Sequence, residues 1–268
     1  PVIKFTLGYF DPVIFLTYRF GLTTAILFPI WLISEHRRSW PHLSPADWLS
    51  LIISGLLGTT LQLLLLFEGF KFTTSLEGTI IISTSPILVA IAGAFWLRDH
   101  ITLREKIGLI VAFIGSIIVV VGPGTSGSLW GNFLILLSNL AWVGYVVLSK
   151  KLLRHALSPL FITMFNFFIG FISMSAILFF TTNHQPITNN LSAHLGVIYM
   201  ALLSGALAYS LYQAGQKSIE ASEANVFLYL QPIFAAPLAY LWLHESFTLP
   251  LAIGSVIIAA GVIVSEIK

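Results

Sequence analysis

Polar side chains recur at helical spacing inside four strongly apolar segments of this sequence. In the segment 77–97, Thr79, Ser83 and Pro86 fall at positions i, i+4 and i+7, which places them on one face of a helix. Three other segments carry similar stripes, namely Asn139, Trp142 and Tyr145; Tyr209 and Gln213; and Asn225, Tyr229 and Pro232. Hydroxyl, amide and indole groups form hydrogen bonds without carrying a charge. The stripes could therefore bind an uncharged or zwitterionic small molecule.

Each stripe has two interpretations. Polar side chains between packed membrane helices can simply join those helices by hydrogen bonds, at about 0.6–2 kcal/mol per contact. Alternatively the stripes line a shared cavity, because polar groups within a membrane usually face a bundle interior or water. For any single residue the two interpretations carry equal weight, whereas stripes on several separate helices favour the cavity.

Pro86 stands in the middle of the segment 77–97, which otherwise reads as one buried helix. Proline has no amide hydrogen and its ring crowds the preceding turn, so the carbonyl of Ile82 is expected to lose its helical partner. Inside a membrane that carbonyl needs a donor from the protein or from a wet cavity. The sequence predicts a kink here. In one interpretation the kink presents a polar wall to a solute. In the other the kink only serves packing, and the side chain of Ser83 or Ser85 donates to the free carbonyl.

Two charged residues within or beside the apolar segments are candidates for a gate or for ion coupling. Arg19 is the seventh residue of the segment 13–34, and Glu68 lies one turn from Lys71, a spacing that permits an ion pair. Glu77 begins the next segment, so a structural network at the outer ends of the helices is the favoured interpretation. In the alternative, Arg19 and Glu68 form an external gate, with a proton as the candidate coupling ion at Glu68.

The residue types and spacings do not support a metal or cofactor site, an enzyme active site or a nucleic-acid-binding surface. The chain has no Cys, and its seven His show no metal-ligand spacing, so we expect neither a metal site nor any other cofactor. No catalytic grouping or phosphate-binding loop stands out, which argues against an enzyme. The basic residues form no patch with aromatic residues between them, which argues against nucleic-acid binding. The absence of charge near the middle of the segments argues against a sugar phosphate as ligand.

Composition places the chain in a lipid bilayer. Of its 268 residues 57% are hydrophobic and only 9% charged, and the mean hydropathy is +0.92. Soluble domains carry about 25% charged residues, and a chain this apolar would expose too much hydrophobic surface to stay dispersed in water. A spanning helix needs about 20 apolar residues. We predict spans at about 13–34, 48–70, 77–97, 104–121, 129–149, 158–181, 194–216, 223–243 and 249–266.

Residues 1–9 are too short to span a membrane, and we interpret them as the tail of a tenth helix that lacks roughly 20 residues here. In alternate loops, ten Lys and Arg residues fall on one side of the predicted membrane and two on the other. The positive-inside rule then places both termini in the cytoplasm. The expected location is the plasma (inner) membrane.

The segments 77–99 and 223–245 match at a constant offset of 146, without a gap. The matched pairs include Glu77 with Glu223, Pro86 with Pro232, Trp96 with Trp242, Gly108 with Gly254, and Gly115 with Gly261. We predict an all-α integral membrane protein of two five-helix repeats, 1–124 and 125–268. An odd number of helices per repeat forces the second repeat into the opposite orientation.

With these features the sequence resembles the drug/metabolite transporter superfamily, and within it the EamA-like permeases. The resemblance rests on ten helices in two halves and on the repeated pattern of an acidic residue, a central Pro and a final "WLRD" or "WLHE". It implies a central pathway lined by the segments 77–97, 129–149, 194–216 and 223–243. It also implies export or import of a small metabolite, often an amino acid or a relative, by alternating access.

The sequence-based prediction is a secondary transporter of a small neutral or zwitterionic metabolite, working as an exporter. Its partners would be that solute, the bilayer and the candidate coupling proton. One alternative is an exporter of lipophilic drugs. Two others are a membrane-embedded enzyme, which would need an acid, base or metal cluster at one depth, and a scaffold that transports nothing. Small-residue pairs such as Ala90 and Ala94 permit close helix contact within the fold or in a dimer.

Overall fold

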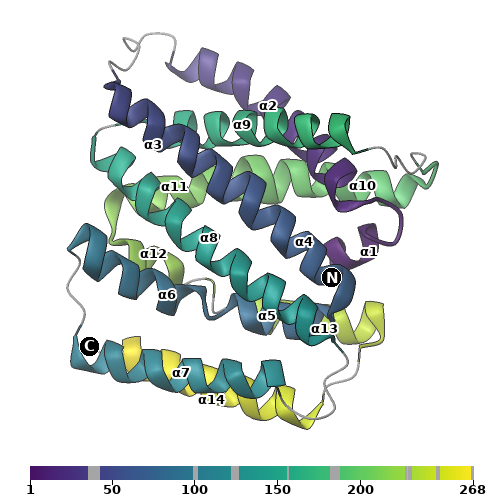
Figure 1. The fold of residues 1–268 in the computed structure, drawn as a ribbon, viewed down its shortest axis with the longest axis vertical. Coiled ribbons are helices and arrows are strands. Elements are labelled where there is room, and N and C mark those ends of the chain that lie inside the picture. Colours follow the sequence, from purple (N-terminus) through teal and green to yellow (C-terminus); the bar gives the residue numbers. More distant parts are fainter. Residues whose placement is uncertain are drawn as a thin grey trace. The chain divides into compact units, whose positions relative to one another are not determined.

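The computed structural model describes residues 1–35, 43–98, 102–121, 127–155, 157–181, 188–226, 228, 231–245 and 248–266. These residues form helices joined by turns, and no strand occurs among them (Figure 1). Six stretches of the described chain are long and apolar enough to cross a membrane, namely Pro12–Glu35, Pro45–Phe72, Ser75–Leu97, Leu129–Arg154, Pro159–Phe180 and Leu191–Ser218. The chain is therefore an all-helical membrane protein, as its composition predicts.

The other predicted spans are also helical, although they are not among these six stretches. The segment 104–121 forms α7 (Leu103–Val121), and 249–266 forms α14 (Leu249–Glu266). The segment 223–243 holds two helices, α12 (Ala221–Val226) and α13 (Gln231–Leu243). Residues 1–9 contain one short helix, α1 (Val2–Thr6).

The chain folds into two compact units, each made of separate stretches of sequence. Unit 1 comprises Pro1, Leu65–Val143 and Ala221–Lys268, and unit 2 comprises Val2–Leu64 and Gly144–Glu220. Each unit draws on both predicted halves of the chain. The predicted boundary between those halves, at 124, lies in 122–126, outside the described residues.

Unit 1 contains the end of α4 (Gln62–Phe72), α5 (Ser75–Ile82), α6 (Ser85–Ala92), the π-helical segment η2 (Gly93–Leu97), α7, the first part of α8 (Leu129–Arg154), α12, α13 and α14. Within it α7 and α14 lie side by side (Figure 1). Glycines allow the close approach: a Cβ on Gly115 would lie 2.9 Å from the carbonyl oxygen of Gly254. A Cβ on Gly261 would lie 2.6 Å from the carbonyl oxygen of Gly108.

The first residues of three helices in unit 1 recur in three later helices at a constant interval. Helices α5, α6 and α7 begin at Ser75, Ser85 and Leu103, and α12, α13 and α14 begin at Ala221, Gln231 and Leu249, each 146 positions later. Arg98 and His244, which are also 146 positions apart, both have positive φ, at 60° and 53°. Left-handed residues of this kind commonly end helices. The offset seen in the sequence therefore recurs in where these helices start and stop.

Unit 2 contains α1, α2 (Pro12–Glu35), α3 (Pro45–Gly55), the π-helical segment η1 (Leu56–Leu61), the start of α4, the second part of α8, α9 (Pro159–Phe180), α10 (Leu191–Tyr199), the π-helical segment η3 (Met200–Ala208) and α11 (Tyr209–Ser218). Helix α2 packs against α9, where the rings of Phe20 and Phe167 meet edge to face at 5.6 Å. Gly170 of α9 allows close approach to both α2 and η1, since a Cβ there would lie 3.0 Å from Phe20 Cδ2 and 2.6 Å from Thr59 Oγ1.

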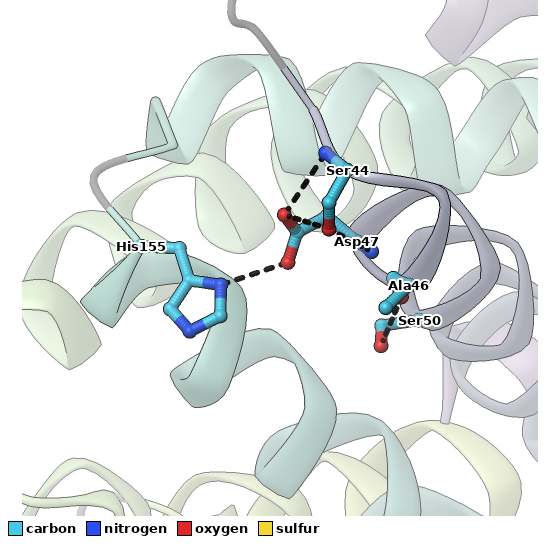
Figure 2. Close-up of polar contacts among 5 residues, drawn as sticks. All are labelled: Ser44, Ala46, Asp47, Ser50 and His155. Atoms are coloured by element: carbon cyan, nitrogen blue, oxygen red, sulfur yellow. Dashed lines mark hydrogen bonds and ion pairs between the residues drawn. The ribbon is translucent and has the colours of Figure 1, made fainter.

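Helix α3 begins with a reciprocal cap, drawn in Figure 2. Ser44 Oγ accepts a hydrogen bond from the Asp47 amide at 3.2 Å, and Asp47 Oδ2 accepts one from the Ser44 amide at 3.2 Å. Pro45 follows the cap and suits the first turn of a helix. The other carboxylate oxygen of Asp47 lies 2.7 Å from Nδ1 of His155, which follows α8. The pair joins the start of α3 to the end of α8 within unit 2.

Candidate functional site

The segment that carries Pro86 is broken rather than kinked. Helix α5 ends at Ile82, Ser83 and Thr84 form a turn, and α6 begins at Ser85. Pro86 is the second residue of α6, a position where proline is well tolerated because the first amides of a helix have no internal partner. The sequence predicted a kink at Pro86, and the structure has a two-residue turn directly before the helix that contains this proline.

Three consecutive hydroxyl side chains donate to carbonyls in the last turn of α5, of which that of Ile81 also accepts from the backbone amide of Thr84 at 3.0 Å. Ser83 Oγ donates to the carbonyl of Ile80 at 2.6 Å, Thr84 Oγ1 to Ile81 at 2.8 Å, and Ser85 Oγ to Ile82 at 2.7 Å. The carbonyl of Ile82, which Pro86 deprives of a helical donor, is therefore satisfied by Ser85. All three hydroxyl residues are at most 3% exposed, so the hydrogen bonds lie inside the protein. Thr79, one turn earlier, donates to the carbonyl of Ser75 at 2.7 Å.

A second helix supports the break. Asn139, on α8, is 1% exposed and its Nδ2 donates to the carbonyl of Ile81 at 2.8 Å. The same nitrogen lies 3.2 Å from Thr84 Oγ1 and donates to it. Sequence spacing placed Asn139 in a polar stripe but gave no reason to single out Thr84, which lies off the predicted stripe.

Trp142 and Asn225 form another pair within unit 1. Trp142 Nε1 donates to Asn225 Oδ1 at 3.0 Å, and Asn225 Nδ2 donates to the carbonyl of Ala221 at 2.8 Å. Asn225 is fully buried on α12. Of the other predicted residues in this region, Tyr229 lies outside the described residues, and Pro232 is the second residue of α13, matching the place of Pro86 in α6.

Unit 2 brings together the remaining predicted stripe residues. Gln213 Nε2, on α11, donates to Tyr145 Oη on α8 at 2.6 Å, and both side chains are fully buried. The other half of the Gln213 amide has no partner among the described residues. The ring of Tyr209 lies 6.2 Å from that of Tyr145. Gly58 makes room for Tyr145, because a Cβ at this position would collide with the tyrosine ring.

Arg19 lies in the same unit, on α2, and is 1% exposed. Its Nη2 donates to Ser204 Oγ of η3 at 3.1 Å. Its Nε and Nη1 have no hydrogen-bond partner within the described residues. Nothing in the sequence marked Ser204, because it lies in the segment 194–216 but outside the stripe of Tyr209 and Gln213.

The acidic residues near the helix ends occupy separate environments. Glu68 and Lys71 form the predicted ion pair at 3.2 Å, and each side chain is 32% exposed. Glu77 is 3% exposed and accepts hydrogen bonds from Thr73, Asn132 and the amide of Gly127. Among the described residues no three His, Asp or Glu side chains gather as a metal site would require.

Comparisons with known proteins show which proteins this chain is similar to. A family model described as "EamA-like transporter family" matches residues 1–121 and, separately, 129–266. "Uncharacterized transporter YyaM" of Bacillus subtilis (strain 168) is 28% identical over 274 residues, a match that covers 98% of this chain and 87% of that protein. An "Uncharacterized transporter" of Archaeoglobus fulgidus is 29% identical over 272 residues, covering 99% of this chain and 91% of that protein.

The fold also resembles that of a protein of known crystal structure. The TM-score is 0.73 at 18% sequence identity, and the alignment covers 98% of this chain and 91% of the other. At this identity the likeness concerns the fold alone.

Proposed function

Because the chain belongs to the EamA-like transporter family, we propose that it is a secondary transporter of a small neutral or zwitterionic metabolite, an amino acid or a relative. Transport would proceed by alternating access and in the direction of export. The chain is a transporter of that family and not an enzyme; the solute class, the mechanism and the direction are the proposal.

The proposed architecture is ten transmembrane helices in two inverted repeats of five. The separate matches of one family model to 1–121 and 129–266 support it. So does the reciprocal packing of α7 and α14, where Gly115 meets Gly254 and Gly261 meets Gly108. An approximate two-fold axis produces contacts of this kind, in which each residue of one element repeats the role of its equivalent in the other. The distribution of Lys and Arg supports cytoplasmic termini in a plasma membrane.

The single observation that carries the proposed mechanism is the break between α5 and α6. Transporters of inverted-repeat architecture bind their solutes near discontinuous helices, where backbone carbonyls lie free of the helical ladder. Here the hydroxyls of Ser83, Thr84 and Ser85 and the amide of Asn139 donate to the carbonyls of the last turn of α5. We propose that these donors exchange their hydrogen bonds with polar groups of the solute during the transport cycle, and that the turn serves as a hinge.

The second polar cluster supports the choice of a neutral or zwitterionic solute. Tyr145, Tyr209 and Gln213 in unit 2 offer hydroxyl and amide groups but no acidic side chain. The half of the Gln213 amide that has no partner can bind a polar group of the solute. Trp142 and Asn225 in unit 1 are likewise uncharged.

Proton coupling through Glu68 is part of the proposal and has its own test. Glu68 is paired with Lys71 and partly exposed, so water can reach its carboxylate. In the Glu68→Gln variant the pH dependence of transport should flatten. An unchanged pH profile would remove the proton role from this residue.

The proposed function is tested by flux measurements on the purified chain in proteoliposomes. A panel of amino acids and related metabolites should include at least one that moves faster than in protein-free vesicles. The combined variant Asn139→Ala, Gln213→Ala and Tyr229→Ala should abolish that flux. Ser50→Ala is a matched control, because among the described residues the exposed Ser50 hydroxyl bonds only the carbonyl of Ala46 in its own helix. Flux that survives the triple variant would refute the proposed pathway.

One observation favours the alternative of a lipophilic solute. An apolar groove in unit 2, with a volume of about 540 Å³, is lined by residues of α2, α3 and α9, including Phe28, Trp31, Trp48, Phe165 and Phe168. A groove of this composition accepts an apolar ring or chain and offers nothing to a zwitterion. Faster flux of amphipathic cations than of amino acids in the same vesicles would select this alternative.

A further inference from the structure

Arg19 presents a buried positive charge whose hydrogen bonds are incomplete. A guanidinium group has five N–H donors and stays protonated inside proteins. Here only Nη2 has a partner, Ser204 Oγ at 3.1 Å, while Nε and Nη1 have none within the described residues. The side chain is 1% exposed, so bulk water does not supply the missing acceptors.

No acidic side chain of the described residues compensates this charge. The hydrogen bonds that surround Arg19 come from neutral groups: Thr23 Oγ1 donates to the backbone carbonyl of Arg19 at 2.8 Å and to that of Ala201 at 3.2 Å. The phenol of Tyr209 lies within electrostatic range of the guanidinium. Buried charges are ordinarily paired, because an isolated ion in a low-dielectric interior is strongly unfavourable. An anion that is absent from the protein's own side chains would complete this environment.

The local fold holds the guanidinium in place. The π-helical η3 packs on α2 through small residues, since a Cβ on Gly205 would lie 2.6 Å from Thr23 Oγ1. This close approach brings Ser204 of η3 within hydrogen-bond distance of Arg19. π-Helical turns occur frequently at functional sites, because the extra residue shifts side chains off the regular helical positions. The guanidinium is thus oriented by Ser204 while the N–H groups of Nε and Nη1 stay available.

We propose that Arg19 binds the carboxylate of the transported solute, so that the solute belongs to the class of monocarboxylates, including zwitterionic amino acids. This inference rests on the proposed transport function: it favours zwitterions over neutral metabolites and adds singly charged monocarboxylates to the solute class. Arginine pairs with carboxylates through two parallel hydrogen bonds, which a single ammonium group cannot match. One guanidinium neutralises one negative charge, and no second cation among the described residues contacts Arg19 to balance a dianion such as a phosphate monoester. The unpartnered half of the Gln213 amide, in the same unit, is the candidate for the solute's ammonium end.

The test compares acids with their carboxamides, which keep the same side group but carry no negative charge. Proteoliposomes of the full chain are assayed for flux of L-phenylalanine, L-leucine and 2-oxo and 2-hydroxy monocarboxylates, each beside its carboxamide. The acids should move about tenfold faster or more than the carboxamides, because each loses a charge-assisted pair with Arg19 when amidated. Arg19→Gln should remove this preference, and Arg19→Lys should restore part of it, since lysine keeps the charge but not the planar fork.

Each outcome decides between the two proposals. Equal flux of acids and carboxamides through the wild-type protein would overturn the carboxylate inference and leave the transport function standing. Flux of no panel member would overturn the transport function and the inference with it. Should Arg19→Gln fail to fold, the acid-to-amide ratio of the wild-type protein still decides. The control variant Ser50→Ala leaves Arg19 and its hydrogen-bond partner Ser204 unchanged and should keep the wild-type ratio of acid flux to carboxamide flux.

Discussion

The side-chain amide of Asn139 donates a 2.8 Å hydrogen bond to the carbonyl oxygen of Ile81, which belongs to the last turn of α5. The bond joins α8 to the point where the helix of residues 75–97 is interrupted. The same carbonyl also accepts from the amide and the hydroxyl of Thr84. One amide therefore couples the position of α8 to the geometry of the turn at Ser83 and Thr84.

Replacing Asn139 by Ala should destabilise the protein by about 1–3 kcal/mol, because the bonds to Ile81 and Thr84 are lost in a buried site. Thermal unfolding in detergent measures this loss. Ser50→Ala should change the midpoint little, because the Ser50 hydroxyl is exposed. If Asn139→Ala unfolds at the wild-type temperature, the hydrogen bond contributes no stability and the proposed coupling fails.

Replacing Pro86 by Ala restores an amide that can donate to the carbonyl of Ile82, where Ser85 now donates. The break should become more helical, so the variant should keep its thermal stability while solute flux falls. Pro232 has the equivalent place in α13, so we expect the same effect from Pro232→Ala. The double variant should lose more flux than either single one. Wild-type affinity and flux in the double variant would count against a role for these prolines in transport.

Replacing Gly115 by Ala should destabilise the packing of α7 on α14. The added Cβ would lie 2.8 Å from Ile258 Cγ1 and 2.9 Å from the carbonyl oxygen of Gly254, and that backbone atom cannot move aside cheaply. The expected cost is about 1–3 kcal/mol, measured by chemical or thermal unfolding.

Gly215→Ala is the matched control for this substitution. Nothing lies within 4 Å of a Cβ at Gly215 on α11. Replacing a helical Gly by Ala there should stabilise the protein by about 0.5–1 kcal/mol. A similar effect of both substitutions would show that the contact between α7 and α14 is looser than the distances indicate.

Replacing Lys150 by Met should weaken the end of α11. Lys150 Nζ donates to the carbonyl of Gln216 at 2.6 Å and to that of Ile219 at 2.5 Å, while its side chain is buried. A cation at this place also balances the negative end of the helix dipole. We expect a loss of about 1.5–3 kcal/mol, the usual range for hydrogen bonds to a charged group.

The neighbouring Lys151 provides the control for Lys150. Its side chain is exposed, so Lys151→Met should cost little. Hydrogen exchange of the amides in α11 should speed up in Lys150→Met and not in Lys151→Met. Equal exchange in both variants would contradict the capping role of Lys150.

The sequence was sufficient for features that depend on spacing along one helix or on comparison of the chain with itself. The ion pair of Glu68 and Lys71 followed from their separation by one turn. The offset of 146 that pairs Pro86 with Pro232 recurs in the structure, where α6 and α13 each start one residue before the proline. Hydropathy located the membrane segments because about 20 apolar residues are needed to cross a bilayer.

Other features were decided by tertiary structure alone. Periodicity places a residue on a face of its own helix, but it does not reveal which face of another helix it will meet. The role of Thr84 therefore follows only from the hydrogen bond that Asn139 donates to it. The role of Ser204 follows only from the hydrogen bond that Arg19 of α2 donates to it. The same limit explains why the sequence offers Arg19 only as part of an outer-end network or, alternatively, of a gate. In the folded chain it is buried, and two of its nitrogens have no partner among the described residues, which supports the proposed binding of an anion.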